Sequence, residues 1–281
     1  MMQGQVCLVT GATSGIGRVT AQEIARLGAT VVVVGRDEQK GRSVISDIVQ
    51  QTGNPNVELM VADLSVQQEI YRLADEFKQH HRQLHVLVNN AGAIFDQRRE
   101  SQDGLEMTFA LNHMGYFLLT NLLLDVIKDS SPARIINVSS DAHRAARIDF
   151  DDLQGEKKYS GFGAYAQSKL ANLLFTYELA ARLEGTGVAV NAVHPGFVNS
   201  GFGTNNGRGW KLFKRLLAPF SLSPQEGAQT SIYLATRPEV EGSTGKYFAK
   251  KRPIQSSKVS YDQKVARRLW QVSQDLIRVA A

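Results

Sequence analysis

Two residues on one predicted helix have the chemistry to move a proton. Tyr165 and Lys169 lie four residues apart in a segment, Phe162–Leu183, whose apolar residues recur at helical spacing. On a helix this spacing places the phenol and the ammonium group on one face, about one turn apart. An ammonium group favours a nearby phenolate, so we expect the pKa of Tyr165 to lie below its usual value of about 10. The two residues are therefore a candidate acid–base pair, although both types are also common on helix surfaces.

A glycine-rich turn lies far upstream of this pair and predicts a dinucleotide-binding site. Gly11, Gly15 and Gly17 follow one predicted strand and open the next predicted helix. At such a turn the backbone can approach a pyrophosphate, which the positive end of the helix stabilises. The spacing is Gly-x-x-x-Gly-x-Gly and not the commoner Gly-x-Gly-x-x-Gly, so a turn without a binding role is the alternative.

The residues that follow the second predicted strand bear on the choice of cofactor. Arg36 is a planar cation suited to a phosphate, and Arg18 in the glycine-rich turn is a second candidate. Asp37 either caps the following helix or approaches a ribose hydroxyl, which would favour NAD(H). Because two cations stand against one acid, we expect NADP(H) to be preferred over NAD(H).

Two further segments end predicted strands on the expected cofactor side. Asp63 follows the third strand and is expected to accept a hydrogen bond from an adenine amino group, to cap the next helix, or both. The fourth strand ends in Asn89-Asn90-Ala91-Gly92, whose small residues permit close approach of a cofactor. A simple turn would explain these small residues as well.

The chain alternates short apolar runs with helical stretches, which predicts an α/β fold. The run Val31–Val34 has no polar alternation, as expected for a strand buried on both faces. Strands joined by helices imply right-handed crossovers, and so a single doubly wound Rossmann-type domain, residues 1–281, with a mostly parallel sheet of about seven strands. The predicted strands are Val6–Val9, Thr30–Val34, Val57–Val61, His85–Asn89, Arg134–Val138 and Val188–Val193, and the other predicted helices are Ile16–Leu27, Glu38–Gln51, Val66–His80 and Gly104–Lys128.

Composition argues against several other classes of protein. The 281 residues carry a net charge of +5, no apolar run reaches the roughly 20 residues that span a bilayer, and we expect no signal peptide before the first strand. Cys7 is the only cysteine, which fits a reducing compartment such as the cytoplasm. The histidines match no metal-site spacing, so no metal is expected. The sequence also contains no Gly-x-Ser-x-Gly hydrolase motif and no nucleic-acid reader motif.

A basic, aromatic segment follows the sixth predicted strand, at the carboxyl ends of the strands, where open α/β sheets bind ligands. Trp210, Phe213, Leu217 and Phe220 recur at spacings of three and four, with basic residues between them. The segment is either an amphipathic helix that closes over the domain, or a lid at about 197–222 over an apolar substrate pocket that also rests on an anionic membrane. A C-terminal extension, about 245–281, adds basic charge between residues 246 and 258.

Taken together, these motifs resemble the short-chain dehydrogenase/reductase family. They run in the expected order from residue 5 to about 200, and the later segments 224–230 and 266–270 resemble the retinol dehydrogenase branch, whose members act on lipophilic alcohols and aldehydes. Many relatives have a threonine after the Pro-Gly turn, whereas this chain has Phe197-Val198-Asn199-Ser200, in which Ser200 is the candidate hydroxyl. The matching motifs are Thr10–Gly17, Asn89–Gly92, Asn112, Asn137–Ser140, Tyr165–Lys169 and His194–Gly196.

The resemblance implies a role for each matching residue. Tyr165 would be the general acid for carbonyl reduction and the base for alcohol oxidation, while Lys169 would bind the nicotinamide ribose and lower the pKa of the tyrosine. Ser140, or with less support Ser139, would hydrogen-bond the substrate oxygen, and Asn112 would hold a water behind Lys169. The expected cofactor-binding residues are Gly11, Thr13, Ser14, Gly15, Ile16, Gly17, Arg18, Arg36, Asp63, Leu64, Asn90, Ala91, Gly92, Tyr165, Lys169, Pro195, Gly196 and Val198.

The resemblance thus implies an NADP(H)-dependent oxidoreductase that interconverts a lipophilic, retinol-like alcohol and its aldehyde or ketone by hydride transfer. Two alternatives stay open, namely an NADPH-dependent reductase of a carbon–carbon double bond, as in protochlorophyllide reductases, and a non-catalytic dinucleotide sensor. Such sensors often lack the tyrosine or the lysine, and both are present here. The expected partner is a small lipophilic substrate and not a nucleic acid, with peripheral membrane contact and homo-oligomers as further expectations.

Overall fold

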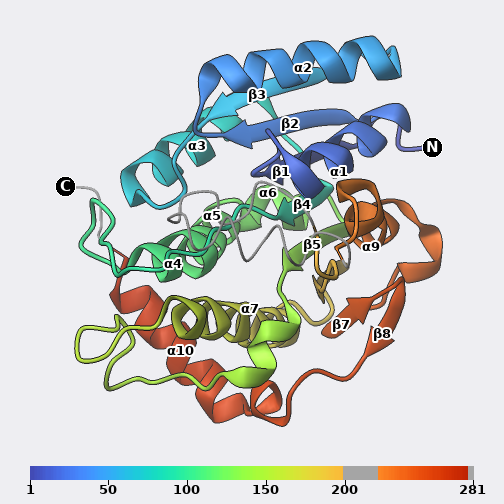
Figure 1. Cartoon of the computed structure of the whole chain (residues 1–281). Coiled ribbons are helices and arrows are strands. Elements are labelled where there is room, and N and C mark those ends of the chain that lie inside the picture. The colour runs from blue at the N-terminus through green and yellow to red at the C-terminus, as the bar shows by residue number, and fades with distance from the viewer. Residues whose placement is uncertain (199–220, 278–281) are drawn as a thin grey trace.

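The computed structural model describes residues 1–198 and 221–277, and these residues form one α/β domain (Figure 1). Their single sheet has eight strands in the order β3-β2-β1-β4-β5-β6-β7-β8, and only the last pair is antiparallel. The fold class predicted from the sequence is confirmed, with one short strand more than expected. The strands are β1 (Val6–Thr10), β2 (Thr30–Gly35), β3 (Val57–Val61), β4 (Val86–Asn89), β5 (Ala133–Val138), β6 (Val188–Val193), β7 (Lys246–Ala249) and β8 (Arg252–Ile254).

The strand order reverses direction between the neighbouring strands β1 and β4. Strand β2 pairs with β1 on one side and with β3 on the other, and Val31–Val34 are fully buried because their side chains alternate between the cores on the two faces of the sheet. From β1 the chain proceeds to β2 and β3 on one side, and β4 then pairs with the opposite side of β1. At such a reversal the loops after β1 and β4 diverge, and open parallel sheets bind ligands there.

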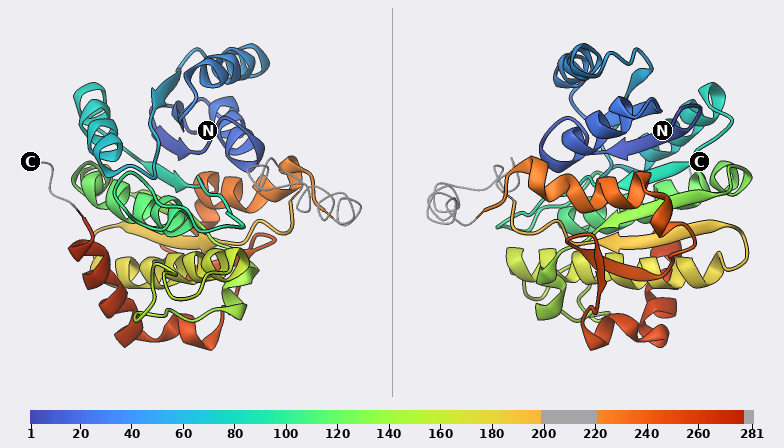
Figure 2. Two further views of the ribbon diagram at one scale, coloured as in Figure 1. Left: turned by 60° about the vertical axis from the view of Figure 1, so that its left-hand side comes forward. Right: turned by 90° about the vertical axis from the view of Figure 1, so that its right-hand side faces the viewer.

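Helices cover both faces of the sheet, and each face has its own hydrophobic core (Figure 2). One face carries α1 (Gly15–Arg26), α2 (Glu38–Thr52) and α9 (Pro224–Thr236). The other face carries α3 (Gln67–His80), α5 (Gly115–Leu122), α6 (Leu124–Asp129) and α7 (Gly161–Arg182). Helices on both faces are what right-handed crossovers between parallel strands produce.

The long helix predicted over Gly104–Lys128 was wrong as one continuous element. The segment consists of α4 (Met107–Phe109), a π-helical turn η1 (Ala110–Met114), α5 and α6. Leu123 leaves helical geometry between α5 and α6, with φ −97° and ψ 4°. A π-helical turn inserts an extra residue into a helix and is frequently found at functional sites. This one contains Asn112.

The C-terminal extension packs against the helical face that carries α7. After β8 come a 3-10 turn η5 (Lys258–Tyr261) and α10 (Gln263–Asp275). Trp270 of α10 is buried, stacks on Phe175 at a centroid distance of 5.8 Å and lies 4.1 Å below the Arg182 guanidinium. The predicted lid lies outside the described residues apart from its ends at 197–198 and 221–222. Within the described part of the chain, no helix has the length and apolar character needed to cross a bilayer.

Candidate active site

Tyr165 and Lys169 share one face of α7, as their spacing predicted. Lys169 is buried, with 3% of its surface exposed, and its Nζ lies 5.7 Å from the centroid of the Tyr165 ring. The same nitrogen donates a hydrogen bond of 2.9 Å to the carbonyl oxygen of Val138, the last residue of β5. The lysine therefore links the helix that carries the phenol to the central sheet.

Burial dominates the electrostatics of this pair. It raises the pKa of Tyr165 to about 12, against the opposing effect of a hydrogen bond with Ser140. It also lowers the pKa of Lys169 from 10.5 to about 7. The expectation that the lysine brings the phenol pKa below 10 was thus wrong for these two groups, because desolvation disfavours both charged forms.

The start of α7 is held against the loop that follows β4. A Cβ atom at Gly161 would lie 2.3 Å from the carbonyl oxygen of Phe95, so only glycine permits this approach. Ser160 caps the helix by accepting a hydrogen bond from the backbone N–H of Gly163. Tyr165 comes little more than one turn later, so this packing helps to set its position.

The two serines after β5 have different partners. The Ser139 hydroxyl is buried and donates to the carbonyl oxygen of Lys169 at 2.8 Å, which ties β5 to α7. The Ser140 hydroxyl hydrogen-bonds with Tyr165 and accepts a bond of 3.2 Å from the backbone N–H of Ala142. Of the two candidates from the sequence, Ser140 is therefore the one that lies beside the phenol.

Asn112 connects the loop after β4 to α7. Its Oδ1 accepts from the Ala93 N–H at 2.9 Å, while its Nδ2 donates to the Ala93 carbonyl at 2.9 Å and to the Ser168 hydroxyl at 3.0 Å. Ser168 in turn donates to the carbonyl oxygen of Tyr165 at 2.7 Å. Both amide hydrogens of Asn112 thus bind protein atoms, and the side chain braces the backbone around the phenol.

The glycine-rich turn packs directly against the end of β4. A Cβ atom at Gly17 would lie 2.4 Å from Asn90 Nδ2 and 2.5 Å from the Gly11 carbonyl oxygen. Gly11 has a φ of +62°, and its Cβ would lie 2.7 Å from the Cα of Ala91. Asn90 Nδ2 donates to the carbonyl oxygen of Thr10 at 2.8 Å, which fixes this arrangement. The structure therefore brings together the glycine-rich turn and the segment at the end of β4, and it leaves no space between them for larger side chains.

The charged residues near the ends of β2 and β3 have separate partners. Asp37 caps α2 by accepting a 2.9 Å hydrogen bond from the Lys40 N–H. Arg18 pairs with Asp47 at 3.0 Å, whereas the Arg36 side chain is 64% exposed and lies 3.9 Å from Asp63. Arg36 is therefore the cation with the more open position.

The remaining residues that the sequence assigned to the cofactor lie at or after the carboxyl ends of the parallel strands. A Cβ atom at Gly35 would lie 2.4 Å from Thr13, and one at Gly92 would lie 3.5 Å from Lys169 Nζ. Val198 reaches α9, where a Cβ atom at Gly227 would lie 2.5 Å from it and 3.3 Å from Ile16. Ser14 directly precedes α1, and Gly15 is its first residue. After β3, Asp63 accepts a hydrogen bond from the Ser65 N–H, and Leu64 is buried. Pro195 and Gly196 follow β6, and Ser200 lies outside the described residues.

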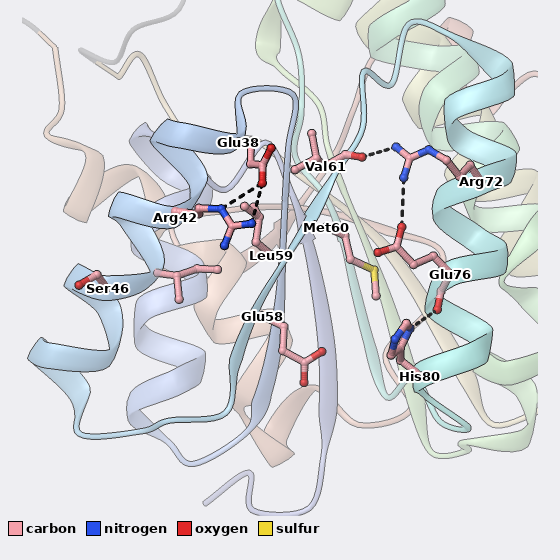
Figure 3. A pocket seen from close by; sticks show the side chains of 11 residues that line it. Glu38, Arg42, Ser46, Glu58, Leu59, Met60, Val61, Arg72, Glu76 and His80 are labelled. Atoms are coloured by element: carbon pink, nitrogen blue, oxygen red, sulfur yellow. Dashed lines mark hydrogen bonds and ion pairs between the residues drawn. The ribbon is translucent and has the colours of Figure 1, made fainter.

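A groove of about 770 Å³ lies apart from these residues, along the edge strand β3 between α2 and α3 (Figure 3). Arg42 pairs with Glu38 at 2.6 Å, and Arg72 pairs with Glu76 at 3.1 Å. Arg72 also donates to the carbonyl oxygen of Val61, on the open edge of the sheet. These side chains satisfy one another and protect an exposed strand edge from pairing with another chain.

Sequence reasoning assigned no chemistry to His143, which the structure places against Ser140. Its Nδ1 lies 2.6 Å from the Ser140 carbonyl oxygen, and the residue is fully buried. Its position three residues after Ser140 was the only available signal, because its second partner, Ser257, lies far along the chain. In the described part of the chain, no three His, Cys, Asp or Glu residues form a group suited to a metal ion.

Comparison with known proteins gives consistent matches. Residues 5–209 match the family model for short chain dehydrogenases. Retinol dehydrogenase 12 of Mus musculus is 46% identical over 276 residues, which are 98% of this chain and 87% of that protein. Polyprenol dehydrogenase of Homo sapiens is 43% identical over 282 residues, with coverage of 98% and 86%.

Solved structures agree with these matches. A protein from Mycobacterium paratuberculosis superposes with a TM-score of 0.79 at 32% identity, over 98% of this chain and 94% of that one. A protein from Escherichia coli CFT073, described as a short chain dehydrogenase complexed with NADPH, has a TM-score of 0.71 at 25% identity, with coverage of 88% and 96%. The similarity thus extends through the whole domain.

Proposed function

Since the chain belongs to the short-chain dehydrogenase family and is an oxidoreductase of alcohol and carbonyl groups, we propose that Tyr165, Lys169, Ser140 and Asn112 form its catalytic set. The observation that carries this proposal is the hydrogen bond between Tyr165 and Ser140. It unites a proton donor from a helix and a second hydroxyl from the end of a strand. Carbonyl reduction needs such a pair beside the reacting oxygen.

The roles follow from the hydrogen-bonding capacity of each group. A bound nicotinamide dinucleotide supplies or accepts the hydride. Ser140 donates a hydrogen bond to the substrate oxygen, and Tyr165 delivers the proton as negative charge develops there. With a pKa of about 12, Tyr165 holds its proton at neutral pH, which suits an acid in the reductive direction. Lys169, anchored to Val138, holds the nicotinamide ribose, and Asn112 maintains the backbone around the site.

We propose NADP(H) as the cofactor. Gly11 and Gly17 allow the turn before α1 to pack closely against Asn90 and Ala91, and the Ser14 side chain does not cap the N-terminus of α1, which suits a pyrophosphate there. Arg36 then provides the exposed cation that a 2′-phosphate requires, since Asp37 is engaged as a helix cap. The likeness to a structure complexed with NADPH supports the same choice.

The proposed substrate is a lipophilic, retinol-like alcohol or its aldehyde or ketone. Two of the relatives are named for retinol and polyprenol, both of which are apolar alcohols. Phe162 lies three residues before Tyr165, so it shares that side of α7, and 58% of its surface is exposed. Phe197, after β6, is 52% exposed. Exposed aromatic side chains at the site edge suit an apolar substrate.

The function is tested by following the oxidation of NADPH by purified protein with a panel of aldehydes that includes all-trans-retinal. Turnover that favours NADPH and long apolar substrates supports the proposal. Substrates with an isolated carbon–carbon double bond, assayed in light and in darkness, test the double-bond reductase. Reduction of these substrates alone would replace the carbonyl proposal with that alternative.

Peripheral contact with an anionic membrane is also part of the proposal, through the turn of the β7–β8 hairpin. Lys250 and Lys251 both have positive φ, +49° and +62°. Two-residue hairpin turns of this kind favour Asn-Gly, and other residues are strained there. Lys250, Lys251, Arg252 and Ile254 are all exposed, and no acidic residue occurs from 246 to 258. A strained basic turn beside an exposed apolar residue suits an anionic lipid surface.

The hairpin turn follows β7, so it lies at the same end of the parallel strands as Ser140, which follows β5. The Lys251 N–H donates to the hydroxyl of Thr230 on α9, the helix that Val198 contacts. Membrane contact at this turn would therefore bring the candidate catalytic residues toward the lipid surface. The cytoplasmic location, the homo-oligomer and the lid at about 197–222 stay predictions from the sequence.

A further inference from the structure

His143 forms hydrogen bonds through both of its ring nitrogens. It lies in the 3-10 turn η2 (Asp141–Ala145), which follows Ser140 directly. Its Nδ1 is 2.6 Å from the carbonyl oxygen of Ser140, and its Nε2 is 3.0 Å from the backbone nitrogen of Ser257. The ring also packs edge-to-face on Tyr247, with centroids 5.2 Å apart.

These two partners determine which nitrogen carries the proton. A backbone N–H can only donate, so Nε2 must accept from Ser257. A carbonyl oxygen can only accept, so Nδ1 must carry the hydrogen and donate to Ser140. His143 is therefore neutral, with its hydrogen on Nδ1. A second proton on Nε2 would face the Ser257 N–H and break that bond.

The same region of η2 binds the C-terminal extension a second time. Arg144 donates to the carbonyl oxygen of Gln255 at 2.7 Å and pairs with Asp141 at 3.1 Å. On the extension, the Ser256 hydroxyl hydrogen-bonds with Tyr177 of α7 at 2.7 Å. The segment 255–257 is thus attached both to the turn after Ser140 and to the helix that carries Tyr165.

We propose that His143 is a positioning residue for Ser140. It holds the Ser140 peptide through Nδ1 and fixes that peptide to the C-terminal extension through Nε2. The backbone N–H of His143 donates to the same carbonyl oxygen at 3.1 Å, so the peptide is restrained by two donors. The hydroxyl of Ser140 is then directed toward Tyr165. This proposal rests on the role proposed above for Ser140 at the substrate oxygen.

The surroundings keep His143 neutral over the working range of pH. Burial lowers its pKa below 6.5, Arg144 and His194 lower it further, and Asp141 and the Ser140 carbonyl act in the opposite direction. The Tyr247 ring adds no charge beside His143, because burial raises the pKa of its phenol. Activity that depends on this contact should therefore persist below pH 6.5 and fall once the ring gains its second proton.

Three variants separate the two contacts of His143. Asn places its amide N–H near the position of Nδ1, so His143→Asn keeps the bond to Ser140 and loses the bond from Ser257. Gln places its amide oxygen near Nε2, so His143→Gln keeps the bond from Ser257 and loses the bond to Ser140. His143→Leu loses both. For each variant we would measure kcat and KM with NADPH and an aldehyde, the NADPH dissociation constant and the melting temperature.

We expect kcat to differ among the three variants, while KM and the NADPH dissociation constant stay nearly constant. His143→Asn should keep most of kcat, whereas His143→Gln and His143→Leu should lose roughly tenfold to a hundredfold, the size that a small misplacement of a reacting group produces. KM and NADPH binding should change little. Equal losses of kcat in all three variants, in step with the melting temperature, would show a purely structural role and overturn the proposal.

Spectroscopic measurements test the two hydrogen bonds of His143 without an activity assay. The ¹⁵N NMR spectrum should show the hydrogen of His143 on Nδ1, and the Ser257 amide should resist hydrogen exchange in the wild type and in His143→Gln but not in His143→Asn. A hydrogen on Nε2 would overturn the proposal. If the wild-type protein reduces no carbonyl, the proposed function fails, while the tautomer and the Ser257 exchange still decide whether His143 holds Ser140.

Discussion

The Nζ of Lys169 lies 2.9 Å from the carbonyl oxygen of Val138, so one hydrogen bond joins the centre of α7 to the end of β5. Tyr165 lies one helical turn before the lysine, and Ser140 follows Val138 by two residues. The contact therefore sets the position of the phenol relative to the Ser140 hydroxyl. It also holds the Lys169 amine within the buried part of the site.

Removal of the Tyr165 hydroxyl should nearly abolish catalysis while the cofactor still binds. For Tyr165→Phe we expect kcat to fall by roughly 10²–10⁴-fold, the usual contribution of a positioned acid or base. The NADPH dissociation constant, measured by fluorescence titration, should change little. Tyr71→Phe, on α3 and outside the proposed site, serves as the control. Wild-type turnover in Tyr165→Phe would remove the tyrosine from the mechanism.

Arg36 should determine the preference for NADPH over NADH. In Arg36→Asp the 2′-phosphate would meet an acid, and the ratio of kcat/KM for the two cofactors should shift toward NADH by about tenfold or more, equivalent to about 1.4 kcal/mol. Arg42→Gln is the matched control, because Arg42 pairs with Glu38 on its own helix. An unchanged ratio in Arg36→Asp would contradict the assignment.

Lys169 should make the protein more stable as the pH rises from about 7 to about 9.5. Its pKa is about 7 in the folded protein, whereas an exposed lysine of the unfolded chain has a pKa of 10.5. In this interval the unfolded chain therefore binds a proton that the folded protein lacks. The free energy of unfolding then rises with pH, by at most about 1.4 kcal/mol per pH unit from this one group. The contribution of Lys169 is the difference between the free energies of unfolding of the wild type and of Lys169→Met, measured by urea unfolding at several pH values. A difference that does not vary with pH would refute it.

A methyl group at Gly17 should impair cofactor binding. The added Cβ would collide with Asn90 and with the backbone of Gly11, both of which are held in place. For Gly17→Ala we expect NADPH to bind at least about tenfold more weakly, as measured by isothermal titration. In the control Gly41→Ala, the new Cβ would meet the flexible side chain of Leu59 and not a fixed backbone. Full affinity in Gly17→Ala would show that the turn does not bind the dinucleotide.

The hairpin turn should support binding to anionic vesicles. The double variant Lys250→Asn, Lys251→Gly gives the turn its preferred residues, so it removes two charges without straining the fold. Loss of about 1 kcal/mol per charge predicts roughly 10–30-fold weaker co-sedimentation with phosphatidylserine vesicles at low salt. The control is the double variant Arg82→Gln, Lys128→Gln. It removes two exposed charges that precede β4 and β5, at the opposite end of the parallel strands. Equal binding by both double variants would rule out a specific contact through the turn.

The sequence alone was sufficient for the fold and for the identity of most candidate residues. Runs such as Val31–Val34 predict strands buried on both faces, because such strands need no polar alternation, and the helices predicted between them indicate parallel pairing. The spacing of Tyr165 and Lys169 predicted one helix face, and the three glycines predicted a tight turn between the first strand and the first helix. Each of these inferences depends on residues that are near one another along the chain.

Tertiary structure decided the matters that depend on distant partners. Periodicity predicted one helix over Gly104–Lys128, and it could not reveal the π-helical turn that carries Asn112 to the Ala93 backbone. Ser139 and Ser140 are alike in sequence, and only the position of α7 distinguishes them.

The same holds for the electrostatics and for His143. The spacing of Tyr165 and Lys169 describes their mutual attraction, whereas their pKa values follow from burial by the whole fold. His143 acquires its second partner from Ser257, more than a hundred residues away. Local spacing determines which groups can share one element, but the charge and the hydrogen bonds of each group depend on what the other elements place around it.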